Sequence, residues 1–227
     1  MEEFLSNMAM YLVSMEAYLG MVLIRFAHIL FGVLWIGLLY YFNFVQTEYF
    51  KESEASAKSD VVQKLVPNAL WYFRWAAAFT FLTGLYLLYY LKMGVSVSIL
   101  LGALMGTIMA ANVWFIIWPN QKKVIAGTHD AADAGAKAGL ASRTNTLLSL
   151  PMLYLMVYSA HGGSSGNMPL MLDSSGNLDL IIGLAIILFI ELNAILGKMN
   201  PAIASVKAVI HSGLALTVIF GLLVQYL

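Results

Sequence analysis

The sequence predicts an all-α protein, a polytopic bundle of membrane-spanning helices that forms a single domain over residues 1–227. Hydrophobic residues make up 61% of the chain and charged residues only 11%, against about 45–50% and about 25% in soluble domains. The mean hydropathy is +0.81. The apolar residues also gather in segments long enough to cross a lipid bilayer. Membrane lipid is therefore the expected surrounding, and the zero net charge argues against nucleic acid as a partner.

Six segments are predicted to cross the membrane, because a bilayer core about 30 Å thick needs about 20 apolar residues per helix. They are residues 18–45, 69–92, 95–118, 144–161, 178–198 and 204–226. Before them, residues 1–17 mix acidic and apolar side chains. We expect this stretch to form a helix that lies at the membrane interface or extends the first span. It lacks the basic start of a secretory signal, so it is expected in the mature protein.

The distribution of basic residues predicts the orientation in the membrane. The connections 46–68 and 119–143 hold six lysines and Arg143, and Lys198 and Lys207 flank the turn between the last two spans. The opposite connections hold little beyond Lys92 and a Gly/Ser-rich loop after His161. Cytoplasmic loops carry an excess of Lys and Arg. The lysine-bearing loops are therefore expected in the cytoplasm and both termini on the periplasmic side.

Polar side chains occur within the predicted spans at two depths, and such residues usually face the interior of a bundle. The group nearer the cytoplasm is Asn43, Gln46, Trp71, Arg74, Trp75, Asn112, Trp114, Arg143 and Asn145. Glu191 and His211 each lie about 10 Å from that edge by helix rise, so they are placed to pair. The alternatives to a binding site are hydrogen bonds between helices, worth about 0.6 kcal/mol each, and tryptophans at the membrane interface.

The outer group, Arg25, His28 and His161, suggests a haem site. Because the chain has no Cys, a haem would be of b type, with His28 as the first iron ligand and Arg25 neutralising a propionate. His161 is the candidate second metal ligand on the same side of the membrane. Helix rise places His28 about 10 Å deep and His161 almost at the surface. The alternatives are a His28 hydrogen-bonded within the bundle and an Arg25 that reaches the outer surface.

Three stretches, in order, resemble the N-terminal membrane domain of the bacterial membrane-bound, cytochrome c-linked urate oxidase (urate hydroxylase) family. They are RFAHILFGVLWIGLLYYF, GTIMAANVWFIIWPNQKKVIA and NTLLSLPMLYLMVYSAH. The resemblance spans most of residues 20–161, and its middle motif reads roughly G-T-x-M-x-A-N-V followed by P-x-Q-x-K-V. The matching positions are His28, Trp35, Gly37, Gly106, Thr107, Met109, Asn112, Pro119, Gln121, Asn145, Pro151 and His161, with Arg74 and Trp75 matching more loosely.

This resemblance implies a protein of the bacterial inner membrane that binds urate or a related purine. The expected substrate-binding residues are Arg74, Asn112, Gln121 and Asn145, while the catalytic residues stay open. Guanidinium and amide groups suit this ligand, because they form forked hydrogen bonds with a planar anion. The resemblance thus predicts a substrate site at the cytoplasmic end of the bundle.

The sequence also departs from the family pattern. The 227 residues hold no Cys-x-x-Cys-His motif of a cytochrome c domain, so the expected electron acceptor is a separate periplasmic cytochrome c or a respiratory complex. The connection LKMGVSVS is shorter than in the family. Arg143 and Thr144 stand where the family tends to have a histidine, which bears on specificity for urate.

Two classes of function remain open. In the first, the protein is a membrane enzyme that oxidises urate or a related small substrate. In the second, it is a non-catalytic haem-binding or accessory subunit of a respiratory membrane complex, with polar clusters that serve packing and docking. Transport is less favoured, because the sequence contains no inverted repeat or pair of broken helices of the kind transporters use.

Overall fold

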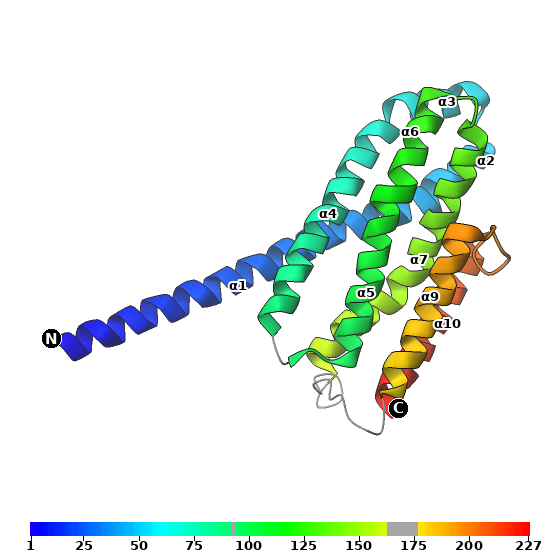
Figure 1. Cartoon of the computed structure of the whole chain (residues 1–227). Coiled ribbons are helices and arrows are strands. Elements are labelled where there is room, and N and C mark those ends of the chain that lie inside the picture. Colours follow the sequence, from blue (N-terminus) through cyan, green and yellow to red (C-terminus); the bar gives the residue numbers. More distant parts are fainter. Residues whose placement is uncertain (92–93, 163–176) are drawn as a thin grey trace.

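The computed structural model describes residues 1–91, 94–162 and 177–227 of the chain, and every regular element in this part is helical, as predicted (Figure 1). Lys92 and most of the loop expected after His161 lie outside the described residues. The elements are α1 (Glu2–Tyr40), η1 (Tyr41–Gln46), α2 (Thr47–Glu52), α3 (Ala55–Lys64), α4 (Val66–Leu91), α5 (Val97–Ala111), η3 (Asn112–Ile117), α6 (Trp118–Ala126), α7 (Ala131–His161), α9 (Leu178–Leu196) and α10 (Val206–Tyr226).

The first elements form one long helix. α1, η1 and α2 follow one another without a break, and Glu3–Glu52 counts as a single candidate span of 50 residues. No proline occurs before Pro67 to interrupt it. At 1.5 Å per residue this helix is about 75 Å long, and Figure 1 shows its N-terminal part projecting away from the other helices. Residues 1–17 are therefore continuous with the helix of the first predicted span, as the second of the two expected arrangements requires.

Four helices in the described part are long and apolar enough to cross a membrane, which indicates a multi-pass membrane protein. They are Glu3–Glu52, Val97–Ala126, Leu178–Leu196 and Val206–Tyr226. α4 and α7 are not among them, so the predicted count of six is not confirmed. α4 carries six Trp and Tyr residues, which are typical of the membrane interface.

α7 lies at the centre of the bundle, where it contacts α1, α5, α6, α9 and α10. Ala141, Leu148 and Leu155 on this helix have no exposed surface. Because its side chains meet protein more than lipid, α7 can carry polar residues that would be costly on a lipid-facing helix. This explains why α7 is less apolar than α1, α5, α9 and α10 around it.

The main core lies where α1, α4, α5 and α7 meet. It includes Trp35, Leu39, Phe73, Met105 and Leu148, all at most 2% exposed. Packing of this kind is a main source of stability between membrane helices, because lipid tails are as apolar as the side chains themselves. Figure 1 places both termini at the end of the molecule opposite α3 and α6, so the loops that carry most of the lysines lie away from the termini.

Two π-helical turns, η1 and η3, lie in the long helices on either side of α7 and contact it. A π-helical turn inserts an extra residue and leaves backbone carbonyls without their usual helical partners, and it is frequent at functional sites. Side chains bind two carbonyls near these turns. Thr47 Oγ1 donates to the Phe42 carbonyl at 2.7 Å, and Asn145 Nδ2 donates to the Met109 carbonyl at 2.9 Å.

Candidate functional site

Buried polar residues gather on one stretch of α7, between the two π-helical turns. Five of them, none more than 5% exposed, are Arg143, Thr144, Asn145, Thr146 and Ser149. Polar groups buried in a membrane bundle are costly unless they find partners. Their concentration at one level of the central helix therefore marks the candidate site.

Two of the predicted substrate-binding residues form a buried hydrogen-bonded chain between η3, α7 and α9. Asn145 Nδ2 donates to the Met109 carbonyl, so its Oδ1 is the acceptor for Asn112 Nδ2 at 2.9 Å. Asn112 Nδ2 also donates to Glu191 Oε2 at 3.0 Å. Asn112 is 2% exposed and Asn145 is fully buried. Both side chains are thus engaged with the bundle itself.

Glu191 and His211 were expected to pair. Among the described residues, the side chain that donates to Glu191 is Asn112, and no ion pair joins Glu191 to His211. His211 is exposed on α10. The two residues do lie at similar depth, each five positions from the helix end that faces the α9–α10 connection.

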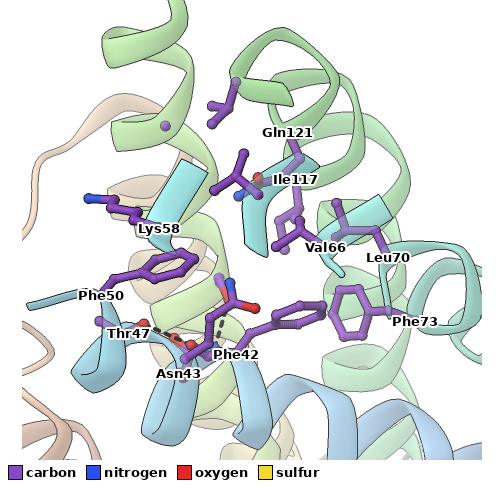
Figure 2. Close-up of a pocket in the computed structure, with 15 residues that line it drawn as sticks. Phe42, Asn43, Thr47, Phe50, Lys58, Val66, Leu70, Phe73, Ile117 and Gln121 are labelled. Atoms are coloured by element: carbon purple, nitrogen blue, oxygen red, sulfur yellow. Dashed lines mark hydrogen bonds between the residues drawn. The ribbon is translucent and has the colours of Figure 1, made fainter. Parts of the chain in front are cut away.

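A pocket of about 360 Å³ opens between η1, α2, α3, α4, η3, α6 and α7 at the end of the bundle away from the termini (Figure 2). Its volume falls in the range of about 300–1,000 Å³ typical of small-molecule sites. Figure 2 shows Phe42, Phe50 and Phe73 around it. Its polar lining residues are Asn43, Gln46, Thr47, Lys58, Gln121 and Ser142.

The polar lining of the pocket favours an anionic ligand. Lys58 is the one ionisable residue in the lining, and no acid joins it there among the described residues. Its Nζ lies 5.4 Å from the centre of the Phe50 ring. Gln46 Oε1 is buried and has no hydrogen-bond donor in the described part of the chain. Asn43 is already engaged, because its Nδ2 donates to Ser142 Oγ at 2.7 Å.

Arg74 occupies a cluster of tryptophans instead of the pocket lining. Its guanidinium carbon lies 3.9 Å from the centre of the Trp118 ring and 5.9 Å from that of Trp114. Trp114 Nε1 donates to the Arg74 carbonyl at 3.1 Å. The Arg74 Nε atom is buried without a hydrogen-bond partner among the described residues. Stacking of this kind holds the guanidinium against the aromatic faces.

His28, on α1, is positioned by α4. His28 Nδ1 lies 3.0 Å from the Thr80 carbonyl and 3.0 Å from Thr83 Oγ1. A methyl group added at Gly84 would lie 3.1 Å from His28 Cε1, so this glycine leaves room for the ring. If Nδ1 carries the proton and donates it to the carbonyl, Nε2 keeps an unshared electron pair that can bind a metal. Many metal-binding histidines have this arrangement.

The chemistry of His28 therefore suits a ligand of iron. The other predicted haem residues are not held in place by such contacts. Arg25 and His161 are both exposed. Among the described residues no contact joins His161 to His28, and no group of three or more His, Cys, Asp or Glu side chains is arranged to hold a metal ion. The chain thus positions one candidate ligand for haem iron.

The structure unites only part of the predicted substrate site. Gln121 lines the pocket, Asn112 and Asn145 pair with each other, and Arg74 stacks on Trp118. Sequence reasoning missed Lys58, which appeared only as one of several loop lysines, and Ser142. No motif in the sequence distinguishes Lys58 from the other loop lysines.

Comparison with known proteins yields one match. Residues 93–172 match the family model described as urate oxidase N-terminal. This segment holds the second and third motifs singled out in the sequence, including Asn112, Gln121 and Asn145, so the predicted resemblance is confirmed there. The first motif, around His28, lies outside the match. No curated protein and no solved structure matches the chain.

Proposed function

From the match of residues 93–172 to the urate oxidase N-terminal family, we propose that this protein binds urate or a related planar purine anion and takes part in its oxidation. The observation that carries the proposal is the pocket of about 360 Å³, which combines phenylalanine rings, amide groups and the Lys58 ammonium. Gln121, Gly135 and Ser142 of this lining belong to the matched segment.

The chemistry of the lining supports a purine anion. A purine ring of this class presents both N–H donors and carbonyl acceptors, and a glutamine amide offers both kinds of partner. Gln46 Oε1 has no donor among the described residues, so it is available to accept from a ring N–H. Lys58 offers a charge-assisted hydrogen bond to the anion. Phe42 and Phe73 supply apolar contact for the planar ring.

The proposed reaction follows from the family resemblance. The purine gains a hydroxyl group from water and gives up two electrons and two protons, and a periplasmic cytochrome c takes the electrons one at a time. We place the pocket at the cytoplasmic side, because residues 46–68 and 119–143, which surround it, hold six of the nine lysines. In this arrangement α4 and α7 also cross the membrane, which completes six spans.

Binding of urate tests this proposal directly. Lys58→Ala is expected to weaken binding roughly 10–100-fold, because a hydrogen bond to a charged group contributes about 1.5–3 kcal/mol. The affinity is measured by isothermal titration calorimetry on the purified protein in detergent. Lys64→Ala is the matched control, since Lys64 lies on the same helix, pairs with Asp60 and is 76% exposed.

Two results would contradict the proposal. One is the absence of urate binding by the unmodified protein. The other is a Lys58→Ala variant whose affinity equals that of the Lys64→Ala control.

The second candidate function is a haem-binding or accessory subunit of a respiratory complex, and the position of His28 favours it. His28→Ala is expected to remove or shift the haem bands in a reduced-minus-oxidised absorption spectrum, because the variant loses the proposed iron ligand. His129→Ala, in the loop before α7, is the control and is expected to leave the spectrum unchanged. A full, unshifted signal in His28→Ala would refute ligation by His28, and a purified protein without haem bands would refute this candidate function.

A further inference from the structure

We propose that Glu191 is a proton-binding site within the membrane, a carboxyl group that stays protonated at neutral pH and reacts with hydrophobic carbodiimides. This inference is independent of the proposed function, because Glu191 lies outside both the pocket lining and the matched segment. It rests on the place of Glu191 in α9, on its hydrogen bond and on the charges of the helices packed around it.

The position of Glu191 puts it in an apolar environment. It lies five residues before Leu196, the last residue of α9, which is about 7.5 Å of helix rise. Its neighbours on α9, including Phe189 and Leu192, expose 76% and 55% of their surface, as lipid-facing side chains do. Glu191 itself is half-buried at this boundary. An ionised carboxylate is costly at such a place unless a cation or several donors accompany it.

The hydrogen bond to Glu191 does not supply that compensation. Asn112 Nδ2 is the one donor to its side chain among the described residues, and it is a neutral amide. Asn112 is fixed in this orientation by Asn145, whose own Nδ2 must donate to the Met109 carbonyl. One neutral donor satisfies the carbonyl oxygen of a protonated carboxyl group equally well. The second oxygen, Oε1, is then left to carry the proton.

The helices packed against α9 also lack a cation that bonds to Glu191. α5 carries no ionisable side chain. α7 contributes Arg143, which is attracted electrostatically by Glu48 on α2. The other ionisable residues of α7 are Asp133, Lys137, Tyr154, Tyr158 and His161. α10 contributes His211, which is exposed, together with Lys207 and Tyr226 near its ends. Among the described residues none of these groups forms an ion pair with Glu191.

Reaction with dicyclohexylcarbodiimide provides the test, because this reagent partitions into lipid and requires a protonated carboxyl group. The carboxyl oxygen bonds to the central carbon of the carbodiimide and the carboxyl proton moves to one of its nitrogens. The O-acylisourea so formed rearranges to a stable N-acylurea, and no group leaves. We expect one adduct at Glu191 when the protein is treated in membranes at neutral pH and its peptides are analysed by mass spectrometry.

The variants are chosen to keep the fold. Glu191→Gln retains an oxygen that accepts from Asn112 and is expected to abolish the adduct. Asp179→Asn, an equivalent change in the first turn of the same helix, is expected to leave it unchanged. His211→Gln is also expected to leave it unchanged, since the proposal gives His211 no part in the protonation of Glu191.

Infrared spectroscopy supplies a second measurement that does not depend on access of the reagent. A difference spectrum between the unmodified protein and Glu191→Gln is expected to contain the C=O stretch of a protonated carboxyl group. The inference is overturned if the spectrum instead contains the bands of a carboxylate at neutral pH. It is equally overturned if an adduct of the same yield forms in Glu191→Gln.

Discussion

Phe73→Ala is expected to lower the free energy of unfolding by about 3 kcal/mol, the low end of the range for Phe→Ala changes in protein cores. Phe73 is 1% exposed and lies in the main core. Its ring meets that of Phe42 edge to face, with centroids 5.4 Å apart. Most of the loss comes from the cavity and the lost packing contacts, since transfer from lipid to a membrane-protein core adds little.

Phe79→Ala is the matched control for this prediction. Phe79 lies on the same helix but is 42% exposed, so lipid or detergent fills the space that the ring leaves. A loss below about 1 kcal/mol is expected, as for most surface substitutions. Both variants are compared with the unmodified protein by denaturant unfolding in detergent. Equal losses in the two variants would show that the described core does not stabilise the bundle.

Hydropathy predicted the apolar helices closely because it measures apolar character directly, and these helices are apolar along most of their length. The last two spans, expected at 178–198 and 204–226, are observed at Leu178–Leu196 and Val206–Tyr226. The third was expected to end at residue 118, before Pro119, yet the helix continues through α6 to Ala126. Pro119 is tolerated there because it stands in the first turn after the π-helical turn η3. The helix ends at Gly127, whose φ of 62° is left-handed.

Hydropathy failed where helical residues are not apolar. The fourth span was expected from residue 144, but α7 begins at Ala131. The stretch AADAGAKAGLA is rich in alanine, which favours helix, while its Asp, Lys and Gly residues lower the hydropathy. A criterion based on the length of apolar segments therefore missed the first turns of α7. These turns include Gly135, which lines the pocket.

The candidate site was predicted only at the level of residue types. The motif containing Asn112 and the one containing Asn145 were both recognised, but their pairing joins residues 33 positions apart and depends on how α5 and α7 pack. The π-helical turns, which shift the side chains that follow them, have no signal in hydrophobic periodicity. Arg74 was assigned to the site by its charge, whereas three neighbouring tryptophans determine where it lies.

Asn145→Leu is expected to destabilise the bundle by about 3 kcal/mol. The change removes the side-chain donor to the Met109 carbonyl and one of the two acceptors of Asn112 Nδ2, at a fully buried position. Each group left without a partner in the interior costs about 1–3 kcal/mol. Since leucine and asparagine are similar in size, the loss reports the missing hydrogen bonds more than a cavity. Unfolding of the variant in detergent gives the value.

A double-mutant cycle separates this network from general damage to the core. Asn112→Leu combined with Asn145→Leu is expected to cost less than the sum of the single changes, by at least about 0.5 kcal/mol, because the second change removes a group that the first left unpaired. Asn68→Leu is the control, since Asn68 is exposed and donates to the Lys64 carbonyl just before α4. Additive losses for the buried pair, or a loss at Asn68 as large as that at Asn145, would contradict the hydrogen-bonded chain as a source of stability.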